Sequence, residues 1–93
     1  MQTYVILRRS AWETGPDLEK AAAKSTQVGD EEMSDQVRWI RSYVLDEEDG
    51  TLGTVCIYQA VDEDAILEHA TRSDIPADEV ILVTDTVLVR DDH

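Results

Sequence analysis

Apolar residues gather along the chain in four short runs, each of about the length of a β-strand. The runs are rich in the β-branched and aromatic residues that favour strands. Asp49 and Gly50 stand between the second and third runs and predict a tight hairpin turn there. The pattern therefore predicts four strands, at residues 3–9, 37–47, 54–60 and 79–89.

Two segments between these runs have the pattern of amphipathic helices. The first helix is predicted to begin near Asp17, which follows Pro16 and is a suitable N-cap, and to be interrupted at Gly29. The second is predicted to begin after Asp62 and to end at about residues 72–73. The first helix carries one stripe of mostly small residues: Leu18, Ala21, Ala22, Ser25 and Val28.

The predicted order of elements is β-α-β-β-α-β, which is the order of the ferredoxin-like fold. Right-handed crossovers would place the four strands in one antiparallel sheet with both helices on one face. A chain of 93 residues is long enough for one small core. We therefore predict an α+β protein with a single ferredoxin-like domain over residues 1–90, followed by a frayed tail at residues 91–93.

The second strand indicates which face of the sheet carries a candidate site. In a regular strand Trp39, Arg41 and Tyr43 point to one side, and Ile40 and Val44 point to the other. An unpaired charge is costly to bury, so Arg41 favours the face without helices. This reasoning places the candidate ligand-binding residues on an open sheet face: Trp39, Arg41, Tyr43, Cys56 and Tyr58.

The first and last strands carry apolar residues on both faces, so both faces of the sheet are expected to be covered. A small monomer rarely exposes a large apolar patch. We therefore predict a homodimer that packs sheet to sheet. Arg41 would lie near an enclosed cavity, where it pairs with an acid, stacks on an aromatic ring or holds a ligand anion.

The charge balance narrows the range of partners. The chain has 21 acidic and 8 basic residues, and its formal net charge is −13. This excess of negative charge disfavours nucleic acid and anionic membrane surfaces. A single cysteine, Cys56, allows no disulfide within the chain, and no apolar run approaches the ~20 residues of a membrane helix. The first residues have no signal-peptide pattern, so a cytoplasmic protein is expected.

The motifs of several segments resemble those of a family of small, largely uncharacterised bacterial ferredoxin-like proteins that are often labelled nickel-binding. The resemblance covers most of the chain and implies nickel as the cofactor. Two departures weaken a transferred metal site, because many relatives have His where Arg41 stands and some have Glu where Gln59 stands. The matching residues are Trp39, Ser42, Tyr43, Cys56, Tyr58, Glu68, His69, Ala70, Pro76 and Ala77.

His69 is the candidate metal ligand, on the face of the second helix that is predicted to point toward the sheet. The alternative is a buried histidine satisfied by one hydrogen bond, because no second His or Cys stands at ligand spacing. Cys56 and His69 are the residue types of a nucleophile and a base, but their spacing does not place them in contact. We therefore assign no catalytic residue.

Three functions remain open. The first is a non-enzymatic, dimeric binding protein that holds a nickel-type metal ion or a small ligand at or near the open sheet face. The second is a cofactor-free enzyme of the dimeric ferredoxin-like barrel type, for which fold analogy is the only support. The third is a protein-interaction module without a small ligand.

Overall fold

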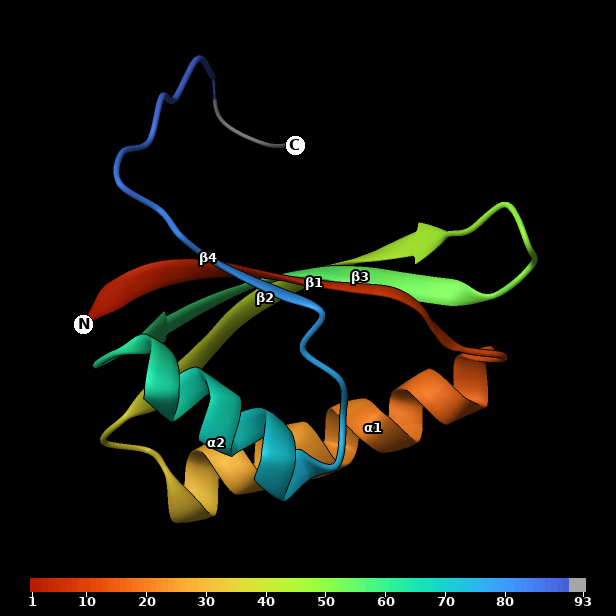
Figure 1. The fold of residues 1–93 in the computed structure, drawn as a ribbon, viewed down its shortest axis with the longest axis horizontal. Helices are drawn as coiled ribbons and strands as arrows, with labels where there is room; N and C mark the ends of the chain where they lie inside the picture. Colours follow the sequence, from red (N-terminus) through yellow and green to blue (C-terminus); the bar gives the residue numbers. More distant parts are fainter. Residues whose placement is uncertain (91–93) are drawn as a thin grey trace.

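The computed structural model describes residues 1–90, and within them the elements follow the predicted order (Figure 1). The helices are α1 (Gly15–Gln27) and α2 (Glu63–Ser73), and a wider π-helical turn, η1 (Val28–Glu32), continues α1. The strands pair antiparallel in the order β2-β3-β1-β4. They are β1 (Gln2–Trp12), β2 (Val37–Asp46), β3 (Leu52–Ala60) and β4 (Glu79–Leu82).

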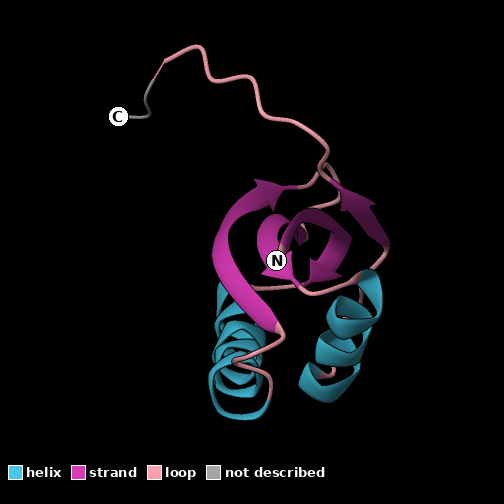
Figure 2. Cartoon of the chain, turned by 90° about the vertical axis from the view of Figure 1, so that its left-hand side faces the viewer, coloured by secondary structure: helices cyan, strands magenta, loops and turns pink. Residues whose placement is uncertain are grey.

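Both helices cover the same face of the sheet, and the opposite face, called the open face below, carries no helix (Figures 1 and 2). The predicted ferredoxin-like α+β fold is therefore confirmed. None of the helices in residues 1–90 is long and apolar enough to cross a membrane.

The start and end of α1 differ from the prediction. Thr14 is the N-cap, because its Oγ1 accepts a hydrogen bond from the backbone N–H of Asp17 at 3.3 Å, and Asp17 lies in the first turn. Gly29 does not interrupt the helix, since the backbone continues through η1. A single glycine lowers helix propensity without excluding the helix. The predicted cap of α2 is correct: the carboxylate of Asp62 accepts from the N–H of Ala65 at 2.8 Å.

The last strand is shorter than predicted, and the extension of the strand to residue 89 is wrong. In the ladder Leu82 stands opposite Tyr4, and the N–H of Val83 donates to the carbonyl of Thr3 at 2.9 Å. Because β1 begins at Gln2, almost no partner backbone remains beyond this point. Residues 84–90 leave the sheet on the side of the open face (Figures 1 and 2).

The core lies between the sheet and the helices. Along β1, alternate side chains point into it, and Tyr4, Ile6 and Arg8 are buried. In β3, the side chains of Cys56 and Tyr58 likewise point into the core and are buried. The helical side of the core is formed by buried residues of α1, η1 and α2: Ser25, Val28, Ala65, Ile66, His69, Ala70 and Ser73.

A β-bulge in β2 changes which side chains share a face. Trp39 stands opposite Tyr58, whereas Arg41 stands opposite Ile57, so Ile40 is an extra residue in the ladder. Because the alternation shifts by one residue at this point, Trp39 faces the helices and Arg41 faces the open side.

The positions of these side chains correct part of the predicted site, Trp39 through the bulge in β2 and Cys56 and Tyr58 through the regular alternation of β3. The prediction that Trp39, Cys56 and Tyr58 line the open face is wrong, because all three lie on the face that the helices cover. The placement of Arg41 and Tyr43 on the open face is confirmed by their register against the outward residues of β3. The five candidate residues are therefore divided between the two faces of the sheet.

Candidate functional site

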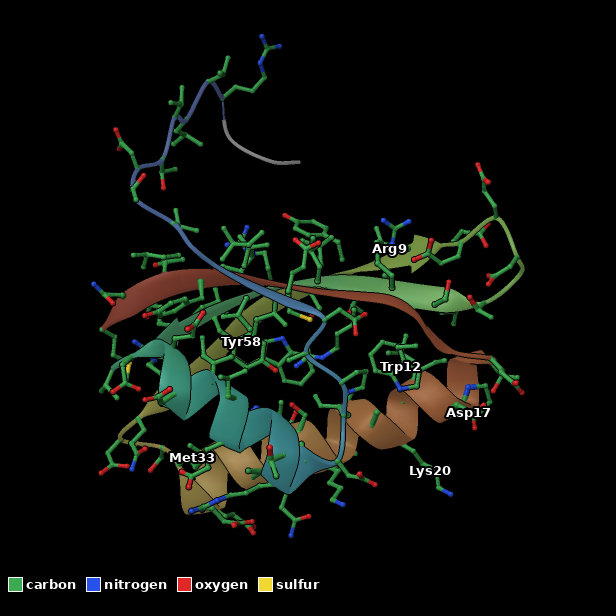
Figure 3. The ribbon with its side chains drawn as sticks, in the orientation of Figure 1. Arg9, Trp12, Asp17, Lys20, Met33 and Tyr58 are labelled. Carbon is green, nitrogen blue, oxygen red and sulfur yellow. The ribbon has the colours of Figure 1, made fainter. Side chains whose placement is uncertain are left out.

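A cavity of about 350 Å³ lies between α1 and the helix-covered face of the sheet. Figure 3 shows Trp12 and Tyr58 in this layer, and Arg9 on the opposite side of the sheet. The walls of the cavity are mainly apolar, with a few polar groups at fixed positions. The lining residues are Arg8, Trp12, Leu18, Glu19, Ala21, Ala22, Ser25, Trp39, Ser42, Val44, Thr54, Cys56, Tyr58 and Ile75.

The small-residue stripe of α1 explains why space remains there. Ala21 and Ala22 carry only a methyl group toward the sheet, and Ser25 is scarcely larger. The opposite wall consists of large rings instead. Trp39 and Tyr58 stack with ring centroids 5.9 Å apart and planes inclined by 10°. The cavity is therefore bounded by a flat aromatic surface on one side and a short-chained helix on the other.

Cys56 is the centre of a polar network in the cavity wall. Trp39 Nε1 donates to Ser42 Oγ at 2.8 Å, and Ser42 Oγ donates to Cys56 Sγ at 2.9 Å. The guanidinium of Arg8 also donates to this sulfur, at 3.2 Å, and the thiol points at Thr54 Oγ1 at 3.4 Å. The network holds the Trp39 ring in place and joins three strands through side chains.

Arg8 is the charged residue of the site, and its side chain is only 1% exposed. Its Nε donates to the carbonyl of Pro76, in the segment between α2 and β4. One guanidinium nitrogen binds Cys56, but the other, NH2, is buried without a hydrogen-bond partner in the described part of the chain. The cavity thus contains a fixed positive charge with unused hydrogen-bonding capacity.

Tyr58 connects the cavity to both helices. Its hydroxyl lies 3.2 Å from Ser25 Oγ, and its ring meets the edge of the His69 ring at a centroid distance of 5.5 Å. Burial raises the pKa of Tyr58, although the Ser25 hydrogen bond and the Arg8 charge oppose this effect. The hydroxyl is therefore a neutral donor and acceptor at neutral pH.

The predicted site residues fall into two groups. Trp39, Cys56 and Tyr58 line the cavity, and their part in binding a ligand stays a prediction. Arg41 and Tyr43 lie away from it, on the open face. Sequence reasoning missed Arg8 as a site residue. The signal was present, because Arg8 continues the alternate positions of the buried Tyr4 and Ile6.

A second, polar depression of about 380 Å³ lies beside the β2–β3 hairpin. Two of its charged groups are paired, because Arg9 Nε and Glu47 Oε1 form a salt bridge at 2.8 Å. The hydrogen bond from Arg9 lowers the pKa of the Glu47 carboxyl, so the carboxylate stays ionised. Asp49 is held by the hydroxyl and the N–H of Thr51. Arg9, Glu47 and Asp49 of this depression are therefore already engaged within the chain, which favours a hairpin surface over a ligand site.

The residues of the described chain do not form a metal centre. Within residues 1–90 no three His, Cys, Asp or Glu side chains come together in a group that could hold a metal ion. His69 is 1% exposed, and its Nε2 donates to the backbone carbonyl of Ser25 at 3.0 Å. This geometry favours a structural histidine, and metal binding by His69 stays a prediction. His93 and the predicted frayed tail lie outside the described residues.

The chain matches, over residues 4–83, the model of a protein family described as nickel responsive protein SCO4226-like, and it belongs to this family. Its structure is similar to the crystal structure of SCO4226 from Streptomyces coelicolor A3(2), with a TM-score of 0.71. The similarity covers 91% of this chain and 99% of that one at 15% sequence identity, so it supports the fold alone. No curated protein matches the chain significantly.

The buried His69 predicts a pH-dependent stability. Burial lowers the pKa of His69 from its ordinary value of 6.5; the Ser25 hydrogen bond opposes this effect, and the nearby Arg8 charge adds to it. Between the lowered pKa of the folded chain and 6.5, His69 is therefore protonated in the unfolded chain and neutral in the folded chain. Stability increases with pH where the unfolded state holds more protons. The contribution of His69 is fully present above the unfolded pKa and is lost as the pH falls toward the folded pKa.

We therefore expect the free energy of unfolding in urea to fall more steeply from about pH 7 to about pH 5 in the wild type than in His69→Gln. Glutamine can still donate to the Ser25 carbonyl but does not titrate. Parallel pH profiles for the two proteins would contradict this account of His69.

Proposed function

We propose that this member of the nickel-responsive SCO4226-like family is a non-enzymatic, homodimeric binding protein that holds a small, mainly apolar molecule in the cavity beneath α1. The cavity itself carries the proposal. Its volume of about 350 Å³ and its apolar walls with a few placed polar groups have the form of small-molecule sites. The cavity is open to solvent on one side, where the exposed residues Glu19 and Val44 line it, so a ligand can enter.

The hydrogen bonds around the cavity support binding rather than catalysis. Cys56 is held by Ser42 and Arg8, and His69 is held by the carbonyl of Ser25. In residues 1–90 no hydrogen bond joins Cys56 to His69, so the candidate nucleophile and base are not assembled as a pair. A cofactor-free enzyme keeps only the support of fold analogy.

The open face supports the proposed homodimer. The strand register produces two rows of side chains across this face, with apolar residues at the centre and a charged residue at one end of each row. Tyr43 and Ile81 are 50% and 46% exposed at the edges. A second copy would remove the apolar centre of this patch from water. The charged side chains at its edge would remain at the rim of the interface, where they contact water or each other. The rows are Arg41–Ile57–Val5–Ile81 and Tyr43–Val55–Leu7–Glu79.

The segment after β4 adds to this argument. It leaves the sheet on the side of the open face (Figure 2), and Val87, Leu88 and Val89 are 87%, 75% and 78% exposed. Three consecutive exposed apolar residues favour contact with a partner surface. We place the segment in the proposed interface with the second copy.

Nickel is the second candidate ligand, and the family description is the observation that favours it. The described residues of one chain do not fit a nickel site, because they bring together no group of three candidate ligands. The net charge of −13 nevertheless raises the local concentration of cations, and exposed carboxylates bind them weakly. We therefore propose modest nickel binding at the acidic surface rather than at the cavity.

The cavity proposal is tested with 1-octanol as a neutral apolar probe. Both tryptophans of the chain, Trp12 and Trp39, line the cavity, so their fluorescence should report occupancy. We expect saturable binding with a dissociation constant of about 1 mM or lower. Ala22→Phe should fill the cavity and abolish the response.

The matched control is Ala23→Phe, because Ala23 is the neighbouring residue of α1 but is exposed and does not line the cavity. It should bind the probe as the wild type does. An equal loss in both variants, or no saturable binding in the wild type, would contradict the cavity as a binding site.

The dimer proposal predicts that sedimentation at micromolar concentration gives twice the mass of one chain. Ile57→Lys should shift the protein to monomers, because it places a charge at the centre of the open face. Leu67→Lys, on the exposed side of α2, should leave the dimer intact. A wild-type monomer that remains soluble at high concentration would exclude the sheet-to-sheet dimer.

For nickel, we expect a dissociation constant no tighter than about micromolar, since carboxylates with at most one imidazole retain several waters on the ion. Calorimetric titration should compare the wild type, His69→Gln and a chain lacking residues 91–93. Identical binding by all three would mean that neither histidine is a ligand. Nanomolar binding by the wild type would contradict the proposed surface association.

A further inference from the structure

The buried guanidinium of Arg8 indicates which small molecule the cavity accepts. Arginine stays charged at every pH at which proteins fold, so Arg8 cannot escape burial by losing a proton. Its described partners are a carbonyl and a sulfur, both uncharged, and in residues 1–90 no salt bridge involves Arg8. The NH2 group has no hydrogen-bond partner in that part of the chain, although the guanidinium lies close enough to the Tyr58 hydroxyl to lower its pKa.

The next residue shows what Arg8 lacks. Arg9 points to the open side, where Glu47 binds it through two hydrogen bonds of 2.8 and 2.9 Å. The chain has 21 acidic residues, yet none of those within residues 1–90 forms a salt bridge with the guanidinium of Arg8. Since an isolated buried charge is costly, a protein that keeps one beside an apolar cavity leaves room for an anion from outside.

We propose that the cavity binds a monoanionic molecule with an apolar body, such as a medium-chain or aromatic carboxylic acid, and that Arg8 holds its carboxylate. This inference rests on the proposed binding function of the cavity and adds the chemical class of the ligand. The NH2 of Arg8 is shielded from water in the unliganded protein, so a carboxylate accepts from it after a small shift of the neighbouring side chains. The hydroxyl-bearing residues Ser42, Thr54 and Tyr58 line the same cavity. The apolar body then lies between the Trp39 ring and Ala22 of α1.

The surrounding charge restricts the ligand to a single negative charge. The net charge of the chain is −13, and Glu19, an exposed residue, lies at the rim of the cavity. One guanidinium offsets one negative charge, and a second charge on the ligand would remain unpaired in an acidic field. Carboxylates are therefore favoured over phosphate dianions. The volume, at the low end of the range for small-molecule sites, also limits the ligand to a small one.

The test compares four probes of matched chain length: octanoate, octanamide, 1-octanol and octyl phosphate, each followed by tryptophan fluorescence. In the wild type we expect octanoate to bind roughly tenfold or more tighter than octanamide and 1-octanol, because a hydrogen bond to a charged partner contributes more than a neutral one. Octyl phosphate should bind more weakly than octanoate. Glu19→Gln should tighten octanoate by roughly twofold and leave 1-octanol unchanged.

Arg8→Met removes the charge and keeps much of the side-chain volume. It should abolish the preference for octanoate while 1-octanol still binds. The unliganded variant should be no less stable than the wild type, because replacing a buried charge by an apolar residue is often neutral or stabilising. Arg9→Met loses the same charge on the open side and should keep the preference.

The outcomes separate the two proposals. Equal binding of octanoate and 1-octanol by the wild type would overturn the role of Arg8 while the cavity remains a binding site, and this comparison needs no variant. Tighter binding of octyl phosphate would overturn the restriction to monoanions. Failure of all four probes to bind would overturn the proposed function of the cavity as well.

Discussion

The extra residue in β2, Ile40, decides which side chains meet the helices. Because the alternation of the strand shifts there, Trp39 and Ser42 face inward together, and Ser42 connects the indole to Cys56. The stacking of Trp39 on Tyr58, the support of the sulfur and the shape of the cavity wall all follow from this shift. In an unbroken strand one of the pair Trp39 and Ser42 would face the open side, and the network would not form. The bulge thus sets the chemistry of the helix-covered face.

Several of the residues that carry the resemblance to the nickel-labelled family surround the cavity. Trp39, Ser42, Cys56 and Tyr58 line it, and the carbonyl of Pro76 binds Arg8. Glu68, by contrast, lies on the surface of α2 and pairs with Arg72, at 3.5 Å. Motifs that had suggested a metal site are therefore explained by packing and hydrogen bonds around a buried guanidinium. Nickel keeps the support of the family description, but the described residues supply an aromatic and polar cavity rather than a ligand set.

The order of the elements could be predicted from the sequence because it depends on local signals, such as the apolar runs, Asp62 as a helix cap and the Asp49–Gly50 turn. The face of each side chain in β2 could not, since the bulge depends on the register against β3 and no residue type marks it. The cost of burying a charge predicts the outward position of Arg41 correctly, but it would also have excluded Arg8 from the core. Arg8 is the arginine that lies in the core, in phase with Tyr4 and Ile6. The length of β4 could not be predicted either, because it depends on where its partner strand β1 begins. The apolar pattern of β4 itself carries no information about that position.

Neighbouring side chains of β1 point to opposite faces of the sheet and so belong to different surfaces. Arg8 faces the cavity, whereas Leu7 and Arg9 face the open side. In β3, Cys56 and Tyr58 belong to the cavity, and Ile57 between them belongs to the open face. A second copy on the open face would therefore leave the cavity lining unchanged, because side chains of opposite parity form the two surfaces. The same two strands carry both surfaces, so bending them for one would displace the other. The proposed dimer would hold β1 and β3 from the open side and so keep Arg8 and the Trp39–Tyr58 stack in position for a ligand.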